Sequence, residues 1–413
     1  MHRPWQTLLV VGLCAAGVVS NARAEPTYEL TWSRQFGTTT DDSGRDVTVD
    51  STGNAVVTGA TGNQAFVRQY DSAGNLAWSQ LISSSGNASF RSATTDSLGN
   101  SYVAGSATGD AFGPSAGGND VIVAKYDSLG NIVWSRQYGT GTNDFASDIA
   151  VDSLGNSLVT RLSNNFQSSA LTKLDTSGNI TWTIPVESLA ISVAADTSNN
   201  IFVAGGAGGG GYLTKYNSAG TFQWRQSINT LAYDAVTGVA VDSSGNLYVA
   251  GHTDGNDFGP NNGFSDAFVI KYDPAGSMLW SHQFGSTEPD YTNSMALDAQ
   301  GSVYLTGLTT GNLAAPSTGG DIFVAKYSAT GDFLWVKQIA AADDLEIGGP
   351  LIAASPAGTV YVTGATGGNL FGDYQGNIDA YLLKLSAVPE PASSALATAA
   401  AIATLFLRRK KKN

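Results

Sequence analysis

The sequence of 413 residues has a single cysteine and few charged side chains. The cysteine is Cys14, so the chain beyond it has no thiol for a disulfide, a redox centre or a thiolate metal site. Three histidines, without cysteine, are too few for a structural zinc site. Charged residues make up 13% of the chain, about half of the usual share in soluble domains. The fold must therefore be stabilised by its apolar core and by its own closure.

Basic residues concentrate at the two ends, and the body of the chain is acidic. The formal net charge is −13. Without residues 1–24 and 389–413, Lys plus Arg falls from 21 to 14 and Asp plus Glu from 34 to 33, which leaves the body near −19. Such a field repels phosphate backbones. Nucleic acid is therefore not expected as a partner, and cations or cationic groups are favoured.

Residues 1–24 have the pattern of a secretory signal peptide. Arg3 gives the positive start, Leu8 to Val19 form the apolar stretch, and Ala22-Arg23-Ala24 is an A-x-A cleavage site that leaves Glu25 first. A buried apolar segment is the alternative. The pattern predicts secretion across the inner membrane.

Residues 388–413 combine a short motif, an apolar run and a basic cluster. Pro389, Glu390 and Pro391 precede 16 largely apolar residues, 392–407, and the basic residues 408–412. This segment resembles a PEP-CTERM sorting signal. The resemblance implies recognition by an exosortase-type membrane protease and transfer to the cell envelope, cell surface or extracellular matrix. A helix of 16 residues is about 24 Å long, short of the roughly 30 Å hydrocarbon core. The tail therefore fits a temporary anchor and the only membrane contact, with a permanent anchor as the alternative.

Seven copies of one unit fill the body of the chain. The unit reads D-S-x-G-N-x-Y-V-x-G, then a variable loop, then F-V-x-K-Y-D-x-x-G-N-x-x-W. Seven tryptophans mark the copies, with a mean spacing of about 50 residues, in the range of propeller repeats. They are Trp32, Trp78, Trp134, Trp182, Trp224, Trp280 and Trp335.

Each copy holds four short alternating runs separated by Gly/Asn turns, the pattern of a four-stranded propeller blade. The seventh copy ends at Ser386 without a tryptophan strand, whereas an unpaired tryptophan strand, 30–35, begins the body. We therefore predict an all-β fold, a seven-bladed β-propeller of residues 25–387 whose N-terminal strand closes the last blade. A large β-sandwich or a β-solenoid is the alternative.

The repeat resembles the SBBP family, the seven-bladed β-propeller repeat of bacterial envelope proteins, over roughly residues 29–386. The family implies a fold and no activity. A weaker similarity to quinoprotein propellers rests on Asp71 to Gly74 followed by Trp78, with an Asp-to-Gly spacing one residue shorter than in that motif.

One face of the predicted ring carries the variation. The second-to-third loops are short in copies one, three and four and long in copies two, five, six and seven, at 108–120, 253–266, 309–321 and 366–379. Acidic blade-to-blade loops share that face, and variable loops on a rigid scaffold usually carry binding. The candidate binding residues are Asp41, Asp42, Asp144, Asp254, Asn256, Asp257, Asp290, Asp343 and Asp344.

Calcium is the one cofactor that the sequence favours. Asp254-Gly255-Asn256-Asp257 places oxygen ligands around a glycine bend, which hard cations prefer. The full EF-hand pattern is absent, and an acidic turn is the alternative.

No catalytic residue is predicted. His252 and His282 lie outside any recognisable nucleophile motif and are interpreted as ordinary surface histidines. The sequence favours a non-enzymatic binding or structural module for a surface glycan or protein. A propeller hydrolase or lyase acting on polysaccharide is the alternative, because acidic groups converge on one face.

Overall fold

The computed structural model describes residues 27–207, 209–228, 232–340, 349–372 and 374–388. The predicted leader, the predicted sorting tail from Pro389, and Asp343 and Asp344 lie outside these residues. Within them, the unit Tyr28–Ala387 holds 28 strands in seven antiparallel sheets of four. The predicted seven-bladed propeller is therefore confirmed. In the same ranges, no helix has the length and hydropathy to cross a bilayer.

The first four blades follow the chain in order. Blade 1 is β2 (Asp42–Val49), β3 (Ala55–Thr61), β4 (Gln64–Tyr70) and β5 (Leu76–Ile82). Blade 2 is β6 (Ala88–Thr95), β7 (Ser101–Thr108), β8 (Asn119–Tyr126) and β9 (Ile132–Tyr138). Blade 3 is β10 (Asp144–Val151), β11 (Ser157–Ser163), β12 (Ser168–Leu174) and β13 (Ile180–Val186). Blade 4 is β14 (Ala190–Ala195), β15 (Ile201–Ala207), β16 (Gly210–Tyr216) and β17 (Phe222–Ile228).

The last three blades include the one that joins the two ends. Blade 5 is β18 (Asp234–Val241), β19 (Leu247–Thr253), β20 (Asp266–Tyr272) and β21 (Met278–Phe284). Blade 6 is β22 (Asp290–Leu297), β23 (Val303–Thr309), β24 (Asp321–Tyr327) and β25 (Phe333–Ile339). Blade 7 is β26 (Leu351–Ala354), β27 (Val360–Thr366), β28 (Asp379–Ala387) and β1 (Tyr28–Phe36).

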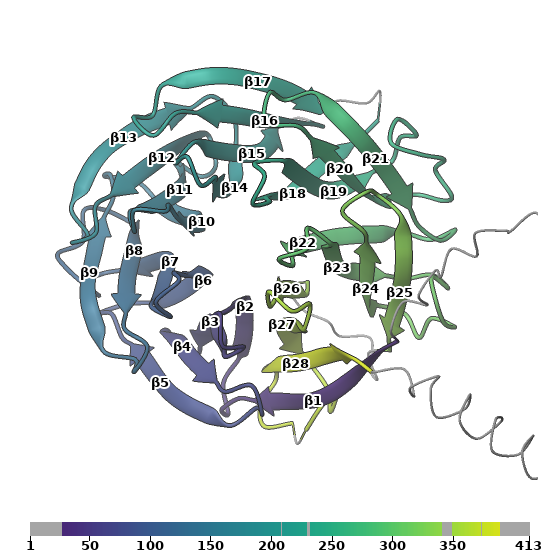
Figure 1. Cartoon of the computed structure of the whole chain (residues 1–413). Helices are drawn as coiled ribbons and strands as arrows, with labels where there is room; N and C mark the ends of the chain where they lie inside the picture. Colours follow the sequence, from purple (N-terminus) through teal and green to yellow (C-terminus); the bar gives the residue numbers. More distant parts are fainter. Residues whose placement is uncertain (1–26, 208, 229–231, 341–348, 373, 389–413) are drawn as a thin grey trace, which may run out of the picture. The chain divides into compact units, whose positions relative to one another are not determined.

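The first strand of each blade lines the central opening and the fourth forms the outer rim (Figure 1). Neighbouring strands of a blade run antiparallel, so the connections between them alternate between the two faces of the ring. One face carries the short first-to-second and third-to-fourth turns. The other carries the second-to-third loops and the blade-to-blade connections, and we call it the long-loop face.

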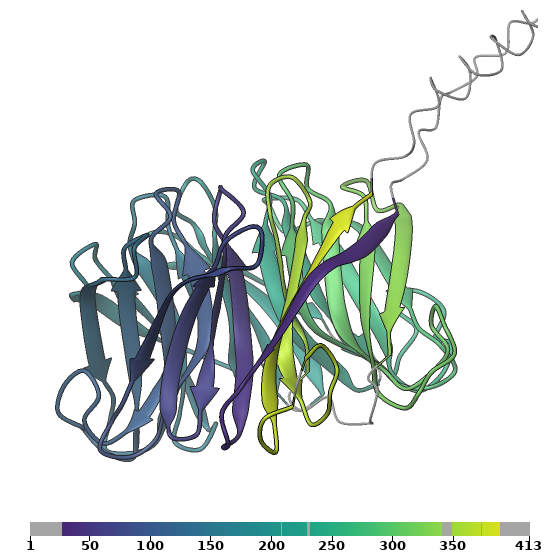
Figure 2. The same ribbon diagram turned by 90° about the horizontal axis from the view of Figure 1, so that it is seen from below.

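The N-terminal strand closes the ring as predicted. β1 pairs antiparallel with β28, from Tyr28 opposite Ala387 to Phe36 opposite Ala380. Figure 2 shows β1, in purple, running alongside yellow β28. The hydroxyl of Tyr28 also donates to the carbonyl oxygen of Gly358 at 3.0 Å. The edge that blade 7 would otherwise expose is therefore paired.

The recurring D-S-x-G-N turns have a structural purpose. In the first of them, Oδ1 of Asp50 accepts the backbone N–H groups of Thr52 and Asn54, both at 2.9 Å, and the Asn54 side chain donates to Oδ2. Such side-chain bonds replace backbone partners in a tight turn. These aspartates therefore hold strands together and are not free for a ligand.

The tryptophan of one blade packs against the glycine of the next blade's third-to-fourth turn. Gly130 has φ of +84°, and a Cβ atom there would lie 2.6 Å from the Trp78 ring. Both the turn and the close contact therefore require glycine. This contact explains why the Gly-Asn turn and the tryptophan recur together in the sequence.

The apolar core is divided among the blade interfaces. Within the described residues, seven buried clusters occur, each built from facing sheets of two neighbouring blades. In the cluster between blades 1 and 2, Val56 and Val67 pack with Phe90 and Ile122, all at most 1% exposed. The ring therefore holds the core together, and no blade has a core of its own.

Candidate functional site: the long-loop face and the central channel

The long loop of blade 2 is held by a partly buried glutamine, Gln137, and a buried aspartate, Asp120. Nε2 of Gln137 donates to Gly109 O at 2.8 Å and to Asp120 Oδ2 at 3.1 Å, and its Oε1 accepts the N–H of Ala111 at 2.9 Å. Asp120 Oδ2 also accepts the N–H of Ala116 at 2.8 Å. Both ends of the loop are therefore fixed to the blade before any ligand arrives.

The same pair, which we call the loop brace, recurs in every blade with a long loop. The glutamine lies three residues after the blade's tryptophan, and the aspartate lies in the third strand. The other three braces are Gln283 with Asp266, Gln338 with Asp321, and Gln35 with Asp379, at 3.2, 2.7 and 2.9 Å. In blade 7 the glutamine comes from β1, so ring closure also fixes that loop.

Three of the predicted binding acids, Asp42, Asp144 and Asp290, lie inside the blade junctions, at most 2% exposed. Their Oδ2 atoms accept the backbone N–H of Thr38, Thr140 and Ser286, each at 2.6 Å. The structure thus shows a turn-stabilising contact for each of the three acids. Their role in binding stays a prediction.

The other predicted binding residues that the structure describes are exposed. Asp41 is exposed at the junction before blade 1, and Asp254, Asn256 and Asp257 are exposed in the long loop of blade 5. Asp254 accepts the hydroxyl of Ser265. Among the residues that the structure describes, no group of three or more His, Cys, Asp or Glu side chains is placed to hold a metal ion. Any calcium in the blade 5 loop would therefore need amide, backbone or water oxygens as well.

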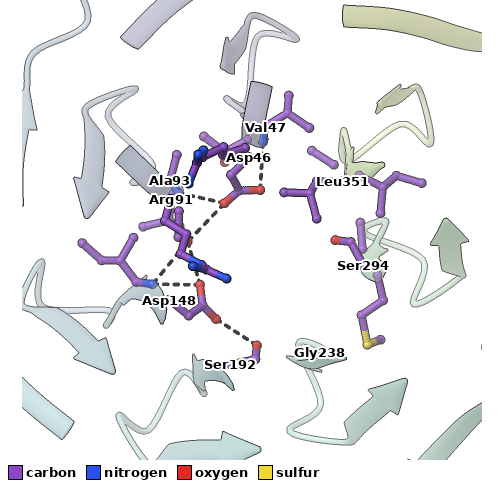
Figure 3. A pocket seen from close by; sticks show the side chains of 18 of the residues that line it. Asp46, Val47, Arg91, Ala93, Asp148, Ser192, Gly238, Ser294 and Leu351 are labelled. Carbon is purple, nitrogen blue, oxygen red and sulfur yellow. Dashed lines mark hydrogen bonds between the residues drawn. The ribbon is translucent and has the colours of Figure 1, made fainter. Parts of the chain in front are cut away.

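The first strands enclose a central channel of about 960 Å³ (Figure 3). Six of them, β2, β6, β10, β14, β18 and β22, carry a bulge where the register with the second strand shifts by one residue. Bulges re-aim side chains. The bulge residue and the one after it therefore both line the channel, at positions that simple alternation does not predict.

Residues just after the bulge form a polar girdle that links neighbouring blades: Asp46, Ser92, Asp148 and Ser192. Oδ2 of Asp46 accepts the backbone N–H of Ala93 at 2.8 Å. The Ser92 hydroxyl lies 3.1 Å from Asp46 and 2.7 Å from Asp148. The Ser192 hydroxyl donates to Asp148 at 2.8 Å. Figure 3 shows Asp46 and Asp148 in this series of hydrogen bonds.

Ser92 has one hydroxyl proton for two carboxylates. If both carboxylates were ionised, the Ser92 proton could bond only one of them, and the lone pairs of the hydroxyl oxygen would face those of the other carboxylate. Burial raises the pKa of Asp46 to about 7, and the neighbouring charge of Asp148 adds to the rise. Burial also raises the pKa of Asp148. The girdle therefore holds an extra proton at mildly acid pH.

Binding of this extra proton makes the stability of the folded protein depend on pH. Between its ordinary pKa of 3.8 and about 7, Asp46 binds more protons in the folded than in the unfolded state. Its contribution is complete below that range and is lost as the pH rises through it. We expect the melting temperature to fall from pH 5 to pH 8, and Asp46→Asn to reduce that fall.

Asp71→Asn is the control for the pH series. Asp71 is exposed, and its pKa is lowered by the hydrogen bond from Asn75. Its contribution is lost only at acid pH, below this range. An Asp46→Asn protein whose melting temperature falls between pH 5 and pH 8 as steeply as the parent would contradict the assignment.

Two arginines occupy bulge positions in neighbouring blades, Arg45 in β2 and Arg91 in β6, and both line the channel. Arg45 Nε donates to the Ser43 hydroxyl at 3.2 Å. Burial lowers the pKa of Arg45, and the nearby charge of Arg91 lowers it further. Within the described residues, neither arginine forms an ion pair.

Both histidines are partly buried and pack against aromatic rings. The His252 ring lies 5.0 Å from the Tyr291 ring, and burial lowers its pKa. The His282 ring stacks on Tyr327 at 5.3 Å. These are packing contacts between blades 5 and 6.

Sequence reasoning missed the channel residues and the loop braces. A bulge shifts alternation by one residue and leaves no composition signal, so Arg45 and Asp46 look like an ordinary polar stretch. The loop braces, by contrast, are visible in the sequence. Glutamine follows the tryptophan by three residues only in copies with a long loop; the short-loop copies have Leu81, Pro185 and Ser227 there.

Comparison with known proteins identifies the repeat. The SBBP family model, described as a beta-propeller repeat, matches residues 31–66, 133–165, 223–259 and 279–314. Each matched segment starts in the fourth strand of one blade and runs through the first two strands of the next. The sequence repeat is therefore out of phase with the blade and spans the blade junction.

Two curated relatives match short parts of much longer proteins. An uncharacterized WD repeat-containing protein of Acanthamoeba polyphaga mimivirus is 24% identical over 261 residues, 54% of this chain and 18% of the relative. The regulatory protein FlaEY of Caulobacter vibrioides is 31% identical over 138 residues, 30% of this chain and 14% of the relative. The chain thus spans less than a fifth of either relative.

Solved structures share the fold. A chain from the crystal structure of BBS1N in complex with ARL6DN, soaked with lead, has a TM-score of 0.51 and 12% identity, covering 89% of this chain and 99% of that chain. A protein from Lactobacillus plantarum has a TM-score of 0.50 and 12% identity, covering 71% and 84%. At such identities the likeness shows the fold alone. With the family match, it makes this chain a seven-bladed propeller that carries SBBP β-propeller repeats.

Proposed function

We propose that this protein is an exported, non-enzymatic binding or structural module, displayed on the cell envelope or in the extracellular matrix. The observation that supports binding is the set of four braced loops on one face of a closed ring. A loop already ordered in the free protein loses less conformational entropy when a ligand arrives. A preformed loop face is therefore suited to recognising a surface glycan or a protein.

A glycan-array screen of residues 25–388, with mass spectrometry of any released product, tests this proposal. Binding without product supports a module. Gln283→Leu should weaken binding by the blade 5 loop about tenfold or more, because it removes the brace to Asp266. Leucine is chosen because Leu81 stands at the corresponding position of blade 1. Gln223→Leu, an exposed change on the outer strand β17, is the matched control. Product release would replace the module with an enzyme.

One observation favours the enzymatic alternative, a polysaccharide hydrolase or lyase. Asp46 and Asp148 are carboxylates with raised pKa values that converge on a deep channel, a feature of acid–base sites. Their oxygens, however, already accept backbone N–H groups and serine hydroxyls. We therefore favour a bracing role for both. Loss of product release in Asp148→Asn, with the fold retained, would favour the enzyme.

The sorting tail decides the final location in this proposal. Replacing Pro389, Glu390 and Pro391 with alanine should leave the protein exported but unprocessed, because the motif is what an exosortase-type protease would read. Fractionation and the mass of the mature chain measure this. Unchanged processing and surface display would remove the sorting role of the tail.

We also propose weak calcium binding in the long loop of blade 5, through Asp254, Asn256 and Asp257. Extracellular modules bind calcium at about 10⁻⁴–10⁻³ M. At a ligand concentration ten times Kd, binding to the folded state adds about 1.4 kcal/mol, so the melting temperature should rise by a few degrees.

The calcium experiment compares melting in calcium, in magnesium and in chelator. The variant with Asp254→Asn and Asp257→Asn should lose the calcium shift. Equal shifts for both ions would indicate charge screening, and no shift would remove calcium from the proposal.

A further inference from the structure

The central channel carries its positive charge in one sector. Arg45 and Arg91 are the bulge residues of blades 1 and 2. The corresponding residues of the next four blades are uncharged and also line the channel: Ser147, Ile191, Thr237 and Asn293. Each arginine is the fourth residue of an eight-residue strand, so both lie about midway along the channel wall.

The two guanidinium groups have no anionic partner among the described residues. In the part of the chain that the structure describes, three carboxylates line the channel, and none forms an ion pair with either arginine: Asp41, Asp46 and Asp148. Asp46 and Asp148 are already bonded to backbone N–H groups and serines of the girdle. Burial lowers the pKa of Arg45, and the like charge of Arg91 lowers it further. Two neighbouring cations without a counter-charge are unfavourable unless an anion joins them.

Arginine is the residue best shaped for an oxyanion. Its planar guanidinium presents paired N–H donors that match carboxylate, sulfate or phosphate. Two such groups at equivalent bulge positions of neighbouring first strands place several N–H donors in one sector of the channel. The channel, of about 960 Å³, has room for a small molecule beside them.

We propose that the sector of the channel wall that carries Arg45 and Arg91 binds a single small oxyanion group. The formal net charge of −13 repels polyanions at a distance, so a lone sulfate, phosphate or carboxylate group fits better than a highly charged chain. This deepens the proposed function and rests on it: the arginine sector of the channel is the subsite for the acidic group of a small ligand, and the braced loops contact the rest.

Calorimetric titration of residues 25–388 tests the site with inorganic sulfate, inorganic phosphate and glucuronate, each against sodium chloride at equal ionic strength. Binding of all three in the parent protein is expected. A glucuronate-only response would assign the site to sugar carboxylates, and a response confined to phosphate or sulfate would assign it to inorganic-type anions. Either pattern keeps the oxyanion subsite and names its source.

Variants decide which residues bind. Arg45→Gln and Arg91→Gln should each weaken binding at least tenfold, and the double variant should show none. Arg225→Gln, whose partner Glu187 lies on the outer rim, is the charge-matched control and should bind like the parent. The double variant should melt no lower than the parent in chloride, since it removes a repulsion.

Two results would overturn the proposal: anion binding that survives in the double variant, or a chloride effect equal to that of sulfate. The glycan-array result separates this failure from failure of the proposed function. If the double variant still binds the array ligand, the loop face is a binding site and the oxyanion subsite is wrong. If the array is silent while sulfate binds, the subsite stands and the proposed glycan ligand is wrong.

Discussion

Removal of β1 should unfold or aggregate the protein. A chain that begins at Thr38 lacks the strand that pairs with β28 along its whole length and supplies Tyr28 and Trp32 to the blade 7 interfaces. The loss exposes the edge of β28 and the apolar side chains beneath it. We expect either insolubility or a melting temperature lower by about 10 °C or more than that of residues 25–388.

A disulfide tests the same closure without deletion. Glu29 and Ser386 are cross-strand partners of β1 and β28. Because the chain beyond Cys14 has no cysteine, Glu29→Cys with Ser386→Cys should form one bond within the molecule and raise the melting temperature. Glu29→Cys alone is the control. A Thr38 chain that melts like the parent, together with a double cysteine variant that stays reduced, would refute closure by β1.

Gly105→Ala should be among the most damaging single changes. Gly105 lies in β7 opposite the bulge of β6, and a Cβ atom there would lie 2.0 Å from Ser89 O and 2.6 Å from Phe90 Cα. Because both contacts are to backbone, the strands themselves must shift. We expect a loss of about 3 kcal/mol or more, on the order of 6 °C in melting temperature.

Gly141→Ala is the matched control for this change. Gly141 lies in the loop between blades 2 and 3, and a Cβ atom there would meet nothing within 4 Å. It should change stability by less than about 0.5 kcal/mol. Equal melting temperatures for the two alanine variants would show that the bulged strands are loosely packed.

The architecture was predictable because its causes are local and repeated. The tryptophan, the Gly-Asn turn and the missing fourth strand of copy seven are each visible in the sequence. Trp78 against Gly130 and β1 beside β28 then give those patterns a physical reason. Seven imperfect copies together indicate a ring more clearly than any one copy does.

The candidate site was less predictable because it depends on contacts between blades. Asp42, Asp144 and Asp290 follow polar stretches of the sequence and look like surface acids. In the structure each begins a first strand, and the preceding turn folds over it. Arg45 and Arg91 are placed by bulges, whose position is fixed by the partner strand. A sequence pattern read from single blades therefore predicts neither the turn that covers these acids nor the position of a bulge.

The origin of blade 7 from both ends of the chain sets an order of events during synthesis. β1 emerges first, but its partner β28 follows only after more than 340 further residues. Every interface between blades 1 and 6 can form earlier, whereas the two interfaces of blade 7 wait for β28. A product terminated before β28 therefore keeps two open edges, so ring closure requires that translation has passed the last strand of the ring.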